Sequence, residues 1–197
     1  MLDCGIMITA SHNPKEDNGL KFAFKDYLNA KGEEITDFYE ETIKGDFLEG
    51  TGSVRKINVK EEYFKAIKDG LKFGDKRIKA VLDPGNGTTS IILKDLYSMF
   101  PIDFTIINGK SDGTFPNHHP DPSIEANLEQ LKKKVLETEA DIGVSFDGDG
   151  DRVGVITNEG KFLPCDYYMI LIIRDIIDKV KNKTFLYDVK CSKSLED

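Results

Sequence analysis

The 197-residue sequence has no tryptophan, only three cysteines and no long hydrophobic run. Its longest apolar stretch, Tyr167 to Ile173, is far too short to cross a bilayer. The cysteines, Cys4, Cys165 and Cys191, are far apart and form no CxxC pair, so they indicate neither a disulfide framework nor a zinc site. No signal-peptide pattern is present. These absences predict a soluble cytoplasmic protein that does not act in a membrane.

Positive charge is also scarce. The sequence has 27 Lys and Arg against 35 Asp and Glu, which gives a formal net charge of −8. Proteins that bind nucleic acid or an anionic membrane surface present a basic face, so this balance argues against both partners. The hydrophobic fraction of 39% is enough for a core, and the length allows one domain or two small ones.

The sequence does contain a dense acidic loop, Asp147-Gly-Asp-Gly-Asp-Arg152. Carboxylates this close together repel one another unless a cation binds among them. Their oxygens are hard ligands, so Mg²⁺ suits the loop better than zinc does. The glycines allow the backbone to curl until the three carboxylates converge. The alternative is a solvated acidic hairpin turn, but a plain turn does not need three aspartates.

The residues around this loop indicate which kind of metal site it is. Asp141 to Phe146 and Val153 to Thr157 both have the pattern of short buried strands. An EF-hand needs flanking helices, glycine at its sixth position and glutamate at its twelfth. Those positions hold Arg152 and Asn158, so the pattern excludes a calcium-sensor loop.

Strand and helix patterns alternate along the chain, which predicts an α/β fold with layered domains and a largely parallel sheet. One helical segment places Leu128, Leu131 and Val135 on a single face. We expect strands at 5–9, 20–24, 78–82, 104–107, 142–146, 153–157 and 184–189, and helices at 33–43, 61–71, 88–100, 125–137 and 166–180.

Three other loops have more than one interpretation. Thr9-Ala-Ser-His-Asn-Pro14 could expose a serine nucleophile, but it is no GxSxG elbow and a simple turn fits equally well. Asp83-Pro-Gly-Asn-Gly87 lacks the GxGxxG spacing and a Walker lysine, which favours a structural turn over a phosphate cradle. In Phe115 to Pro122, adjacent His118 and His119 point to opposite sides, which favours a stiff connector over a chelating pair.

Taken together, the Thr9–Pro14 and Asp147–Arg152 loops resemble those of the α-D-phosphohexomutases, the phosphoglucomutase/phosphomannomutase family. The resemblance covers essentially the whole chain and includes Asn18 to Phe22 and Asp188-Val-Lys-Cys191. It implies layered αβα domains with mixed, largely parallel sheets. It also implies reversible transfer of phosphate between the 1- and 6-positions of a hexose, glucose or mannose, through a phosphoserine enzyme and a hexose bisphosphate. Hexose phosphates and this bisphosphate are the implied partners.

The resemblance also implies roles for individual residues. Ser11 would carry the phosphate, and its phosphoserine would bind Mg²⁺ together with the three aspartates of the acidic loop. Lys21 would be the general acid/base for the sugar hydroxyl, and Arg152 would contact phosphate. The implied set is therefore Ser11, Lys21 and Arg152 in catalysis, His12, Asn13 and Lys190 in phosphate or substrate binding, and Ser11, Asp147, Asp149 and Asp151 at the metal.

By the same resemblance, residues 1–53 are the C-terminal part of a first domain, 54–157 a complete second domain, and 158–197 the N-terminal part of a third. The family's Gly-Glu-x-Ser-Gly-His sugar loop and basic phosphate loop are absent from this sequence. We therefore expect the chain to be inactive alone, and we expect the edges of its incomplete domains to favour self-association.

Two other classes of function stay open. A phosphatase of the haloacid-dehalogenase type also ends a strand with a D-x-D metal loop, but it uses the first aspartate as nucleophile. It also has threonine or valine where this chain has Asp151. The other class is a non-catalytic metal-binding fragment.

Overall fold

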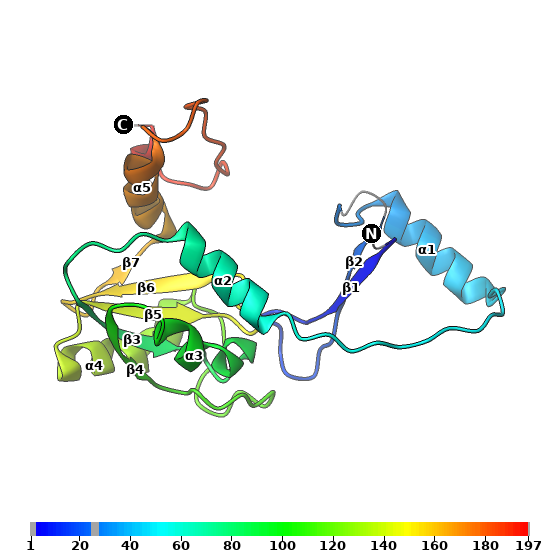
Figure 1. The fold of residues 1–197 in the computed structure, drawn as a ribbon, viewed down its shortest axis with the longest axis horizontal. Helices are drawn as coiled ribbons and strands as arrows, with labels where there is room; N and C mark the ends of the chain where they lie inside the picture. The colour runs from blue at the N-terminus through cyan, green and yellow to red at the C-terminus, as the bar shows by residue number, and fades with distance from the viewer. Residues whose placement is uncertain (1–2, 25–27, 197) are drawn as a thin grey trace. The chain divides into compact units, whose positions relative to one another are not determined.

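The computed structural model describes residues 3–24 and 28–196, which form two compact units, Met1–Lys72 and Phe73–Asp197 (Figure 1). The first unit contains an antiparallel hairpin of β1 (Gly5–Ile8) and β2 (Leu20–Ala23), followed by helices α1 (Glu33–Lys44) and α2 (Lys60–Gly70). These elements agree with the strands and helices that the sequence predicts for this part of the chain.

Aromatic packing joins the hairpin to α1 in the first unit. The ring of Phe38 on α1 lies 5.1 Å from the ring of Phe22 and 5.7 Å from that of Phe24, measured between centroids. Such distances are typical of favourable aromatic pairs. The helix ends at Gly45, whose left-handed conformation (φ 68°) is the usual C-terminal stop of a helix. The hairpin that carries the serine loop is thereby anchored to a defined helix.

The second unit is built on a five-stranded sheet with strand order β4-β3-β5-β6-β7 (Figure 1). Strand β3 is parallel to both β4 and β5, whereas β6 and β7 continue the sheet antiparallel. The sheet is therefore mixed, with a parallel half where strand and helix alternate in the sequence. Its strands are β3 (Ile78–Asp83), β4 (Ile102–Ile106), β5 (Ile142–Phe146), β6 (Val153–Thr157) and β7 (Phe162–Leu163).

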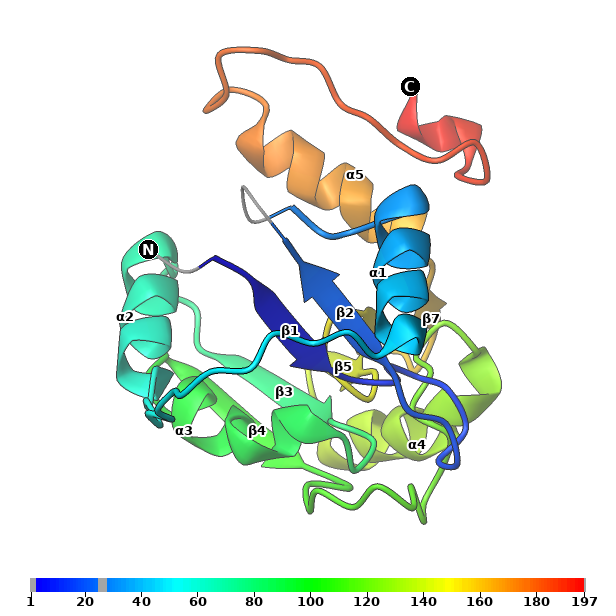
Figure 2. The same cartoon turned by 90° about the vertical axis from the view of Figure 1, so that its right-hand side faces the viewer.

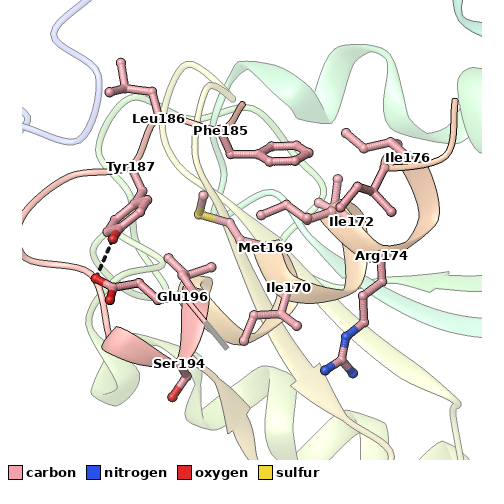
Figure 3. Close-up of a pocket in the computed structure, with 13 residues that line it drawn as sticks. Met169, Ile170, Ile172, Arg174, Ile176, Phe185, Leu186, Tyr187, Ser194 and Glu196 are labelled. Carbon is pink, nitrogen blue, oxygen red and sulfur yellow. Dashed lines mark hydrogen bonds between the residues drawn. The ribbon is translucent and has the colours of Figure 1, made fainter. Parts of the chain in front are cut away.

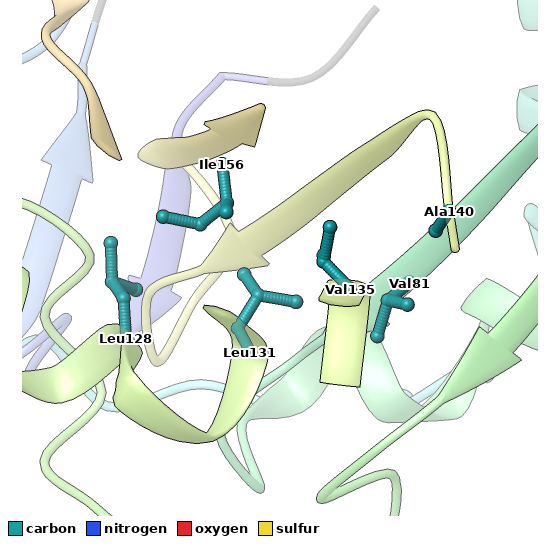
Figure 4. Packing of buried hydrophobic residues seen from close by; sticks show 6 residues of the cluster. All are labelled: Val81, Leu128, Leu131, Val135, Ala140 and Ile156. Atoms are coloured by element: carbon teal, nitrogen blue, oxygen red, sulfur yellow. The ribbon is translucent and has the colours of Figure 1, made fainter. Parts of the chain in front are cut away.

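Helices cover both faces of this sheet, which gives the expected αβα layers. On one face, η3 (Glu125–Leu128) and α4 (Glu129–Thr138) pack their apolar side chains against the strands. On the other face, η2 (Thr88–Ile91) and α3 (Leu93–Tyr97) bury Leu93 against Ala80 and Leu82. The first core, shown in Figure 4, consists of Val81, Leu128, Leu131, Val135, Ala140 and Ile156. The predicted apolar face of Leu128, Leu131 and Val135 is confirmed.

After β7 the chain forms α5 (Cys165–Ile176) and then loops back beside that helix, ending with η4 (Lys193–Leu195) (Figure 2). None of the helices in the described residues is long and apolar enough to cross a membrane.

Three expectations about secondary structure are wrong. The single helix expected at 88–100 is a 3-10 turn and a short α-helix joined at Ile92, in a segment where the β-branched Thr88, Thr89, Ile91 and Ile92 weaken helix propensity. The strand expected at 184–189 is irregular, because no strand among the described residues pairs with it. The helix expected to reach residue 180 ends at Ile176, and β7 was not predicted.

Candidate functional site

The acidic loop connects β5 to β6, and its three carboxyl groups converge. One oxygen from each of Asp147, Asp149 and Asp151 can be chosen so that all lie within 4.8 Å of one another. Asp147 is buried, Asp149 is half-buried and Asp151 is exposed. The site is lined by hard oxygen atoms and opens from the buried Asp147 toward the exposed Asp151, so it could hold a divalent metal ion.

The carboxylate of Asp147 organises the backbone of this loop. Its Oδ1 accepts hydrogen bonds from the Gly150 N–H at 2.9 Å and the Arg152 N–H at 3.0 Å. Gly150 has φ +82°, a conformation that L side chains rarely adopt, and a Cβ there would lie 2.4 Å from Thr89 Cγ2. The glycine and the buried aspartate together fix how the loop curls.

The turn after β3 supports the acidic loop from the neighbouring strand. Thr88 donates from its backbone N–H (2.9 Å) and from its hydroxyl (3.1 Å) to the Gly148 carbonyl. If Gly87 carried a Cβ, that atom would lie 2.8 Å from the backbone carbonyl oxygen of Gly148 and 3.1 Å from that of Asp147. Only glycine therefore allows the two backbone segments to approach this closely. These contacts agree with the interpretation of Asp83 to Gly87 as a structural turn.

A buried contact between an aspartate and a histidine holds the same turn. Asp83, fully buried at the end of β3, accepts from the Gly85 N–H (2.9 Å) and lies 3.0 Å from His118 Nε2. His118 Nδ1 lies 2.9 Å from the His119 carbonyl. Burial lowers the pKa of His118, but the hydrogen bonds to Asp83 and the His119 carbonyl outweigh it, so the pKa lies above its ordinary value.

The Asp83–His118 pair could not be predicted from the sequence. The two residues lie 35 positions apart, and no local pattern connects a strand end with a histidine in a proline-framed connector. The interpretation of Phe115 to Pro122 as a stiff connecting segment is compatible with the structure, because His118 in this segment contacts Asp83 in the turn after β3. The acidic loop supplies the only cluster of potential metal ligands among the residues that the structure describes.

In the first unit, the serine loop places Ser11 in a strained conformation. Ser11 has φ +55°, which is uncommon for a residue other than glycine and costs of order 1–3 kcal/mol. Its N–H donates to Thr9 Oγ1 at 2.9 Å, and its Oγ lies 3.2 Å from His12 Nδ1. Ser11 and His12 are both half-buried. The loop thus holds the serine hydroxyl beside an imidazole nitrogen.

Backbone contacts close this loop onto the hairpin. The Thr9 N–H donates to the Gly19 carbonyl at 2.9 Å, and the Asn13 N–H donates to the Ala10 carbonyl at 3.0 Å. Asn13 Nδ2 donates to Asp17 Oδ2 at 3.2 Å, within the loop itself. Lys21 is exposed on β2 opposite Met7 of β1. The hairpin register thereby fixes where Lys21 lies along the strand pair.

Two further expected residues lie in the second unit. Arg152 is exposed at the end of the acidic loop. Lys190 is exposed beyond α5, and its ammonium lies 3.8 Å from Asp188 Oδ2. The roles expected for Arg152, Lys190, Lys21, His12 and Asn13 stay predictions.

One cavity of the second unit contains none of the expected site residues. It has a volume of about 590 Å³ and lies between α5 and the returning C-terminal segment (Figure 3). Tyr187 Oη donates to Glu196 Oε1 at 2.6 Å at its margin. Apart from Arg174, Tyr187, Ser194 and Glu196, its lining is apolar: Met169, Ile170, Ile172, Ile173, Ile176, Ile177, Phe185, Leu186 and Leu195. This lining does not provide a cluster of charged or polar side chains suited to binding a phosphate or a metal ion.

Two family models match the chain. The model described as phosphoglucomutase/phosphomannomutase, alpha/beta/alpha domain II, matches residues 61–160, which are 100 of the 197 residues. The model for domain I of the same family matches residues 1–49. The acidic loop lies in the first match and the serine loop lies in the second.

Individual relatives agree with these matches. A phosphomannomutase/phosphoglucomutase of Pseudomonas syringae is 38% identical over 97% of this chain, and a phosphoglucomutase of Neisseria meningitidis is 34% identical over the same share. A crystal structure of a phosphoglucomutase/phosphomannomutase family protein from Burkholderia thailandensis matches with a TM-score of 0.84 and 32% identity, over 90% of this chain and 38% of that one. The chain spans 41% to 42% of the length of these two curated relatives.

Proposed function

The chain belongs to the phosphoglucomutase/phosphomannomutase family, and we propose that the protein is a phosphohexomutase, an isomerase that works as an intramolecular phosphotransferase. Its reaction would move phosphate reversibly between the 1- and 6-positions of a hexose. The observation that carries the proposal is the convergence of Asp147, Asp149 and Asp151 in a segment that matches this family. The strained Ser11 loop, in the other matched segment, adds support.

In the proposed reaction, phosphoserine at Ser11 is the phosphoryl donor. The Oγ–P bond breaks, a new bond forms between phosphorus and the sugar hydroxyl oxygen, and the hydroxyl proton passes to Lys21 as general base. The resulting hexose bisphosphate reorients, the bond between its other phosphorus and the sugar oxygen breaks, and this phosphate returns to the Ser11 oxygen while Lys21 gives its proton to the released sugar oxygen. Since little covalent assistance is needed in phosphoryl transfer, the protein contributes mainly positioning and charge stabilisation.

We assign the metal site to the acidic loop and its metal to Mg²⁺. Three carboxyl groups with an oxygen from each within 4.8 Å of the others supply the hard donor set that this ion prefers. When bound, Mg²⁺ would neutralise charge on the phosphoryl group. Arg152, at the end of the same loop, would contact phosphate with its planar guanidinium, and His12 and Asn13 would steady the serine loop.

Glucose and mannose phosphates are the proposed substrates, since the named relatives include phosphoglucomutases and phosphomannomutases. Lys190 is a proposed substrate contact. A cytoplasmic location, self-association through strand edges, and a lack of turnover by this 197-residue chain alone belong to the same proposal.

The position of the phosphate on the enzyme tests the proposal. The protein produced from its complete coding sequence would be incubated with a radiolabelled hexose bisphosphate, digested with trypsin and mapped. We expect acid-stable phosphate on the peptide that ends at Lys15 and contains Ser11, because phosphoserine survives acid. The Ser11→Ala variant should take up no label.

The same experiment distinguishes a mutase from a phosphatase of the haloacid-dehalogenase type. Acid-labile phosphate on Asp147, with none on Ser11, would identify an aspartyl-phosphate enzyme and overturn the mutase assignment. Asp147 is buried and one of its oxygens accepts two backbone hydrogen bonds, so the geometry favours a structural and metal-binding role. Metal binding without label on either residue would indicate a non-catalytic protein.

A further inference from the structure

Cys165 and the backbone next to Cys191 meet at one carboxylate in the second unit. Cys165, at the start of α5, donates from its Sγ to Asp166 Oδ1 at 3.3 Å. The other oxygen, Asp166 Oδ2, accepts from the Ser192 N–H at 2.7 Å, which brings the residue that follows Cys191 onto the same side chain. The structure therefore brings Cys165 and the residue next to Cys191 onto the two oxygens of one side chain, although the spacing of the two cysteines in the sequence gives no sign of a pair.

The electrostatics of Asp166 and Cys165 are consistent with this arrangement. The pKa of Asp166 lies below its ordinary value because the Ser192 N–H and the Cys165 thiol donate to it, with a smaller contribution from the Cys191 thiol. The pKa of Cys165 is raised by burial first, and then by its hydrogen bond to Asp166, the charge of Asp166 and the nearby Cys191. The smaller contributions of Cys191 to both pKa changes are consistent with a position of its thiol near the same carboxylate.

We propose that Cys165 and Cys191 are a redox-active thiol pair that closes reversibly to a disulfide. Both side chains are reachable by a small oxidant, since Cys165 is exposed and Cys191 is half-buried. A bridge here would tie the segment from Asp188 to Ser192 to the start of α5. Lys190, a proposed substrate contact, lies within that segment, so oxidation would restrict where its side chain can reach.

The oxidant in this proposal is a low-molecular-weight disulfide such as oxidised glutathione. One protein thiolate attacks a sulfur of the oxidant, which forms a mixed disulfide and releases one reduced thiol. The second protein thiol loses its proton and attacks the protein sulfur of that mixed disulfide, which releases a second reduced thiol. Both electrons pass from the cysteine pair to the oxidant. Because thiolate is the attacking form and the pKa of Cys165 is raised, the closure should become faster as pH rises.

Peptide mapping of the 197-residue chain tests the pair directly. The chain would be equilibrated in buffers with increasing ratios of oxidised to reduced glutathione, quenched with acid, alkylated and digested with trypsin without reduction. We expect a single linked product that joins Phe162–Arg174 to Cys191–Lys193 and disappears with dithiothreitol. Because ring closure is intramolecular, it should reach half-formation at a ratio about tenfold lower than the mixed disulfide on Cys4.

Three serine variants make the result decisive. Cys4→Ser should keep the linked peptide, whereas Cys165→Ser and Cys191→Ser should lose it and show a mixed glutathione disulfide on the remaining cysteine of the pair. Circular dichroism would confirm that each variant is folded. The proposal is overturned if wild-type Cys165 and Cys191 carry separate glutathione adducts at every ratio. It is also overturned if links through Cys4 form as readily as the expected one.

Discussion

Thr88 gives both its backbone N–H and its hydroxyl to the carbonyl oxygen of Gly148, at 2.9 and 3.1 Å. Gly148 stands between the first two aspartates of the acidic loop, and Thr88 follows the turn that ends β3. The contact therefore joins the loop after β5 to the loop after β3, whose strands are parallel neighbours in the sheet. The geometry of the carboxylates depends on support from a segment that is far away in the sequence.

The first prediction is that Thr88→Val weakens binding of Mg²⁺. The substitution preserves the shape of the side chain but removes the hydroxyl bond to Gly148, and a single hydrogen bond contributes about 0.5–1.5 kcal/mol. Affinity measured by calorimetric titration should fall by about twofold to tenfold. Thr88→Ser keeps the hydroxyl and should bind like the wild type. Equal affinities for the valine and serine variants would show that the backbone N–H alone holds Gly148.

The second prediction concerns the carboxylates themselves. Removal of Asp149 takes away one of three converging oxygen donors, so the Asp149→Ala variant should lose most of its affinity for Mg²⁺ in the same titration. Asp178→Ala is the matched control, because it removes the same charge from an exposed carboxylate that pairs with a surface lysine, Lys183. If Asp149→Ala binds as tightly as Asp178→Ala, the acidic loop is not the metal site.

The acidic loop could be predicted because the information is local. Its three aspartates lie within a few residues of one another, and the strands on either side, Ile142 to Phe146 and Val153 to Thr157, have the same bounds in the structure as in the prediction. Alternation of buried and partly exposed residues marks such strands. A short loop between two well-defined strands restricts the directions of its side chains. The convergence of the three carboxyl groups therefore follows from the local sequence.

Features that depend on distant partners could not be predicted. Asp83 meets His118, and Cys165 and Ser192 meet at the carboxylate of Asp166, only after the chain has folded. The segment 184–189 has the composition of a strand, but a strand also requires a neighbour, and the described residues supply none. Local pattern shows what a segment prefers, whereas pairing depends on what the rest of the fold places beside it.

The third prediction tests the core that holds the sheet to α4. Leu131 is fully buried between α4 and the strands, so Leu131→Ala should lower the free energy of unfolding by about 2–5 kcal/mol through lost burial and the cavity left behind. Leu136→Ala on the same helix is the control, since this side chain is 53% exposed and should cost far less. Urea unfolding followed by circular dichroism measures both. Similar losses for the two variants would contradict the packing seen in Figure 4.

The fourth prediction follows from the interaction between Asp83 and His118. Because the pKa of His118 is raised in the folded state, the folded protein binds this proton more tightly than the unfolded chain does. The resulting stabilisation is complete below the ordinary histidine pKa of about 6.5 and is lost as pH rises through the folded-state value. The free energy of unfolding of the wild type, relative to that of His118→Gln, should therefore be larger at about pH 5.5 than at about pH 8.

Urea unfolding at several pH values between these limits measures the difference. His119→Gln is the matched control, since it changes the exposed neighbouring histidine and leaves the contact between Asp83 and His118 in place, so it should keep the pH dependence of the wild type. Because Asp83 also binds the Gly85 N–H, loss of its partner should loosen the turn that supports Thr88 and Gly148. A constant difference between wild type and His118→Gln across this range would mean that the proton on His118 does not stabilise the turn.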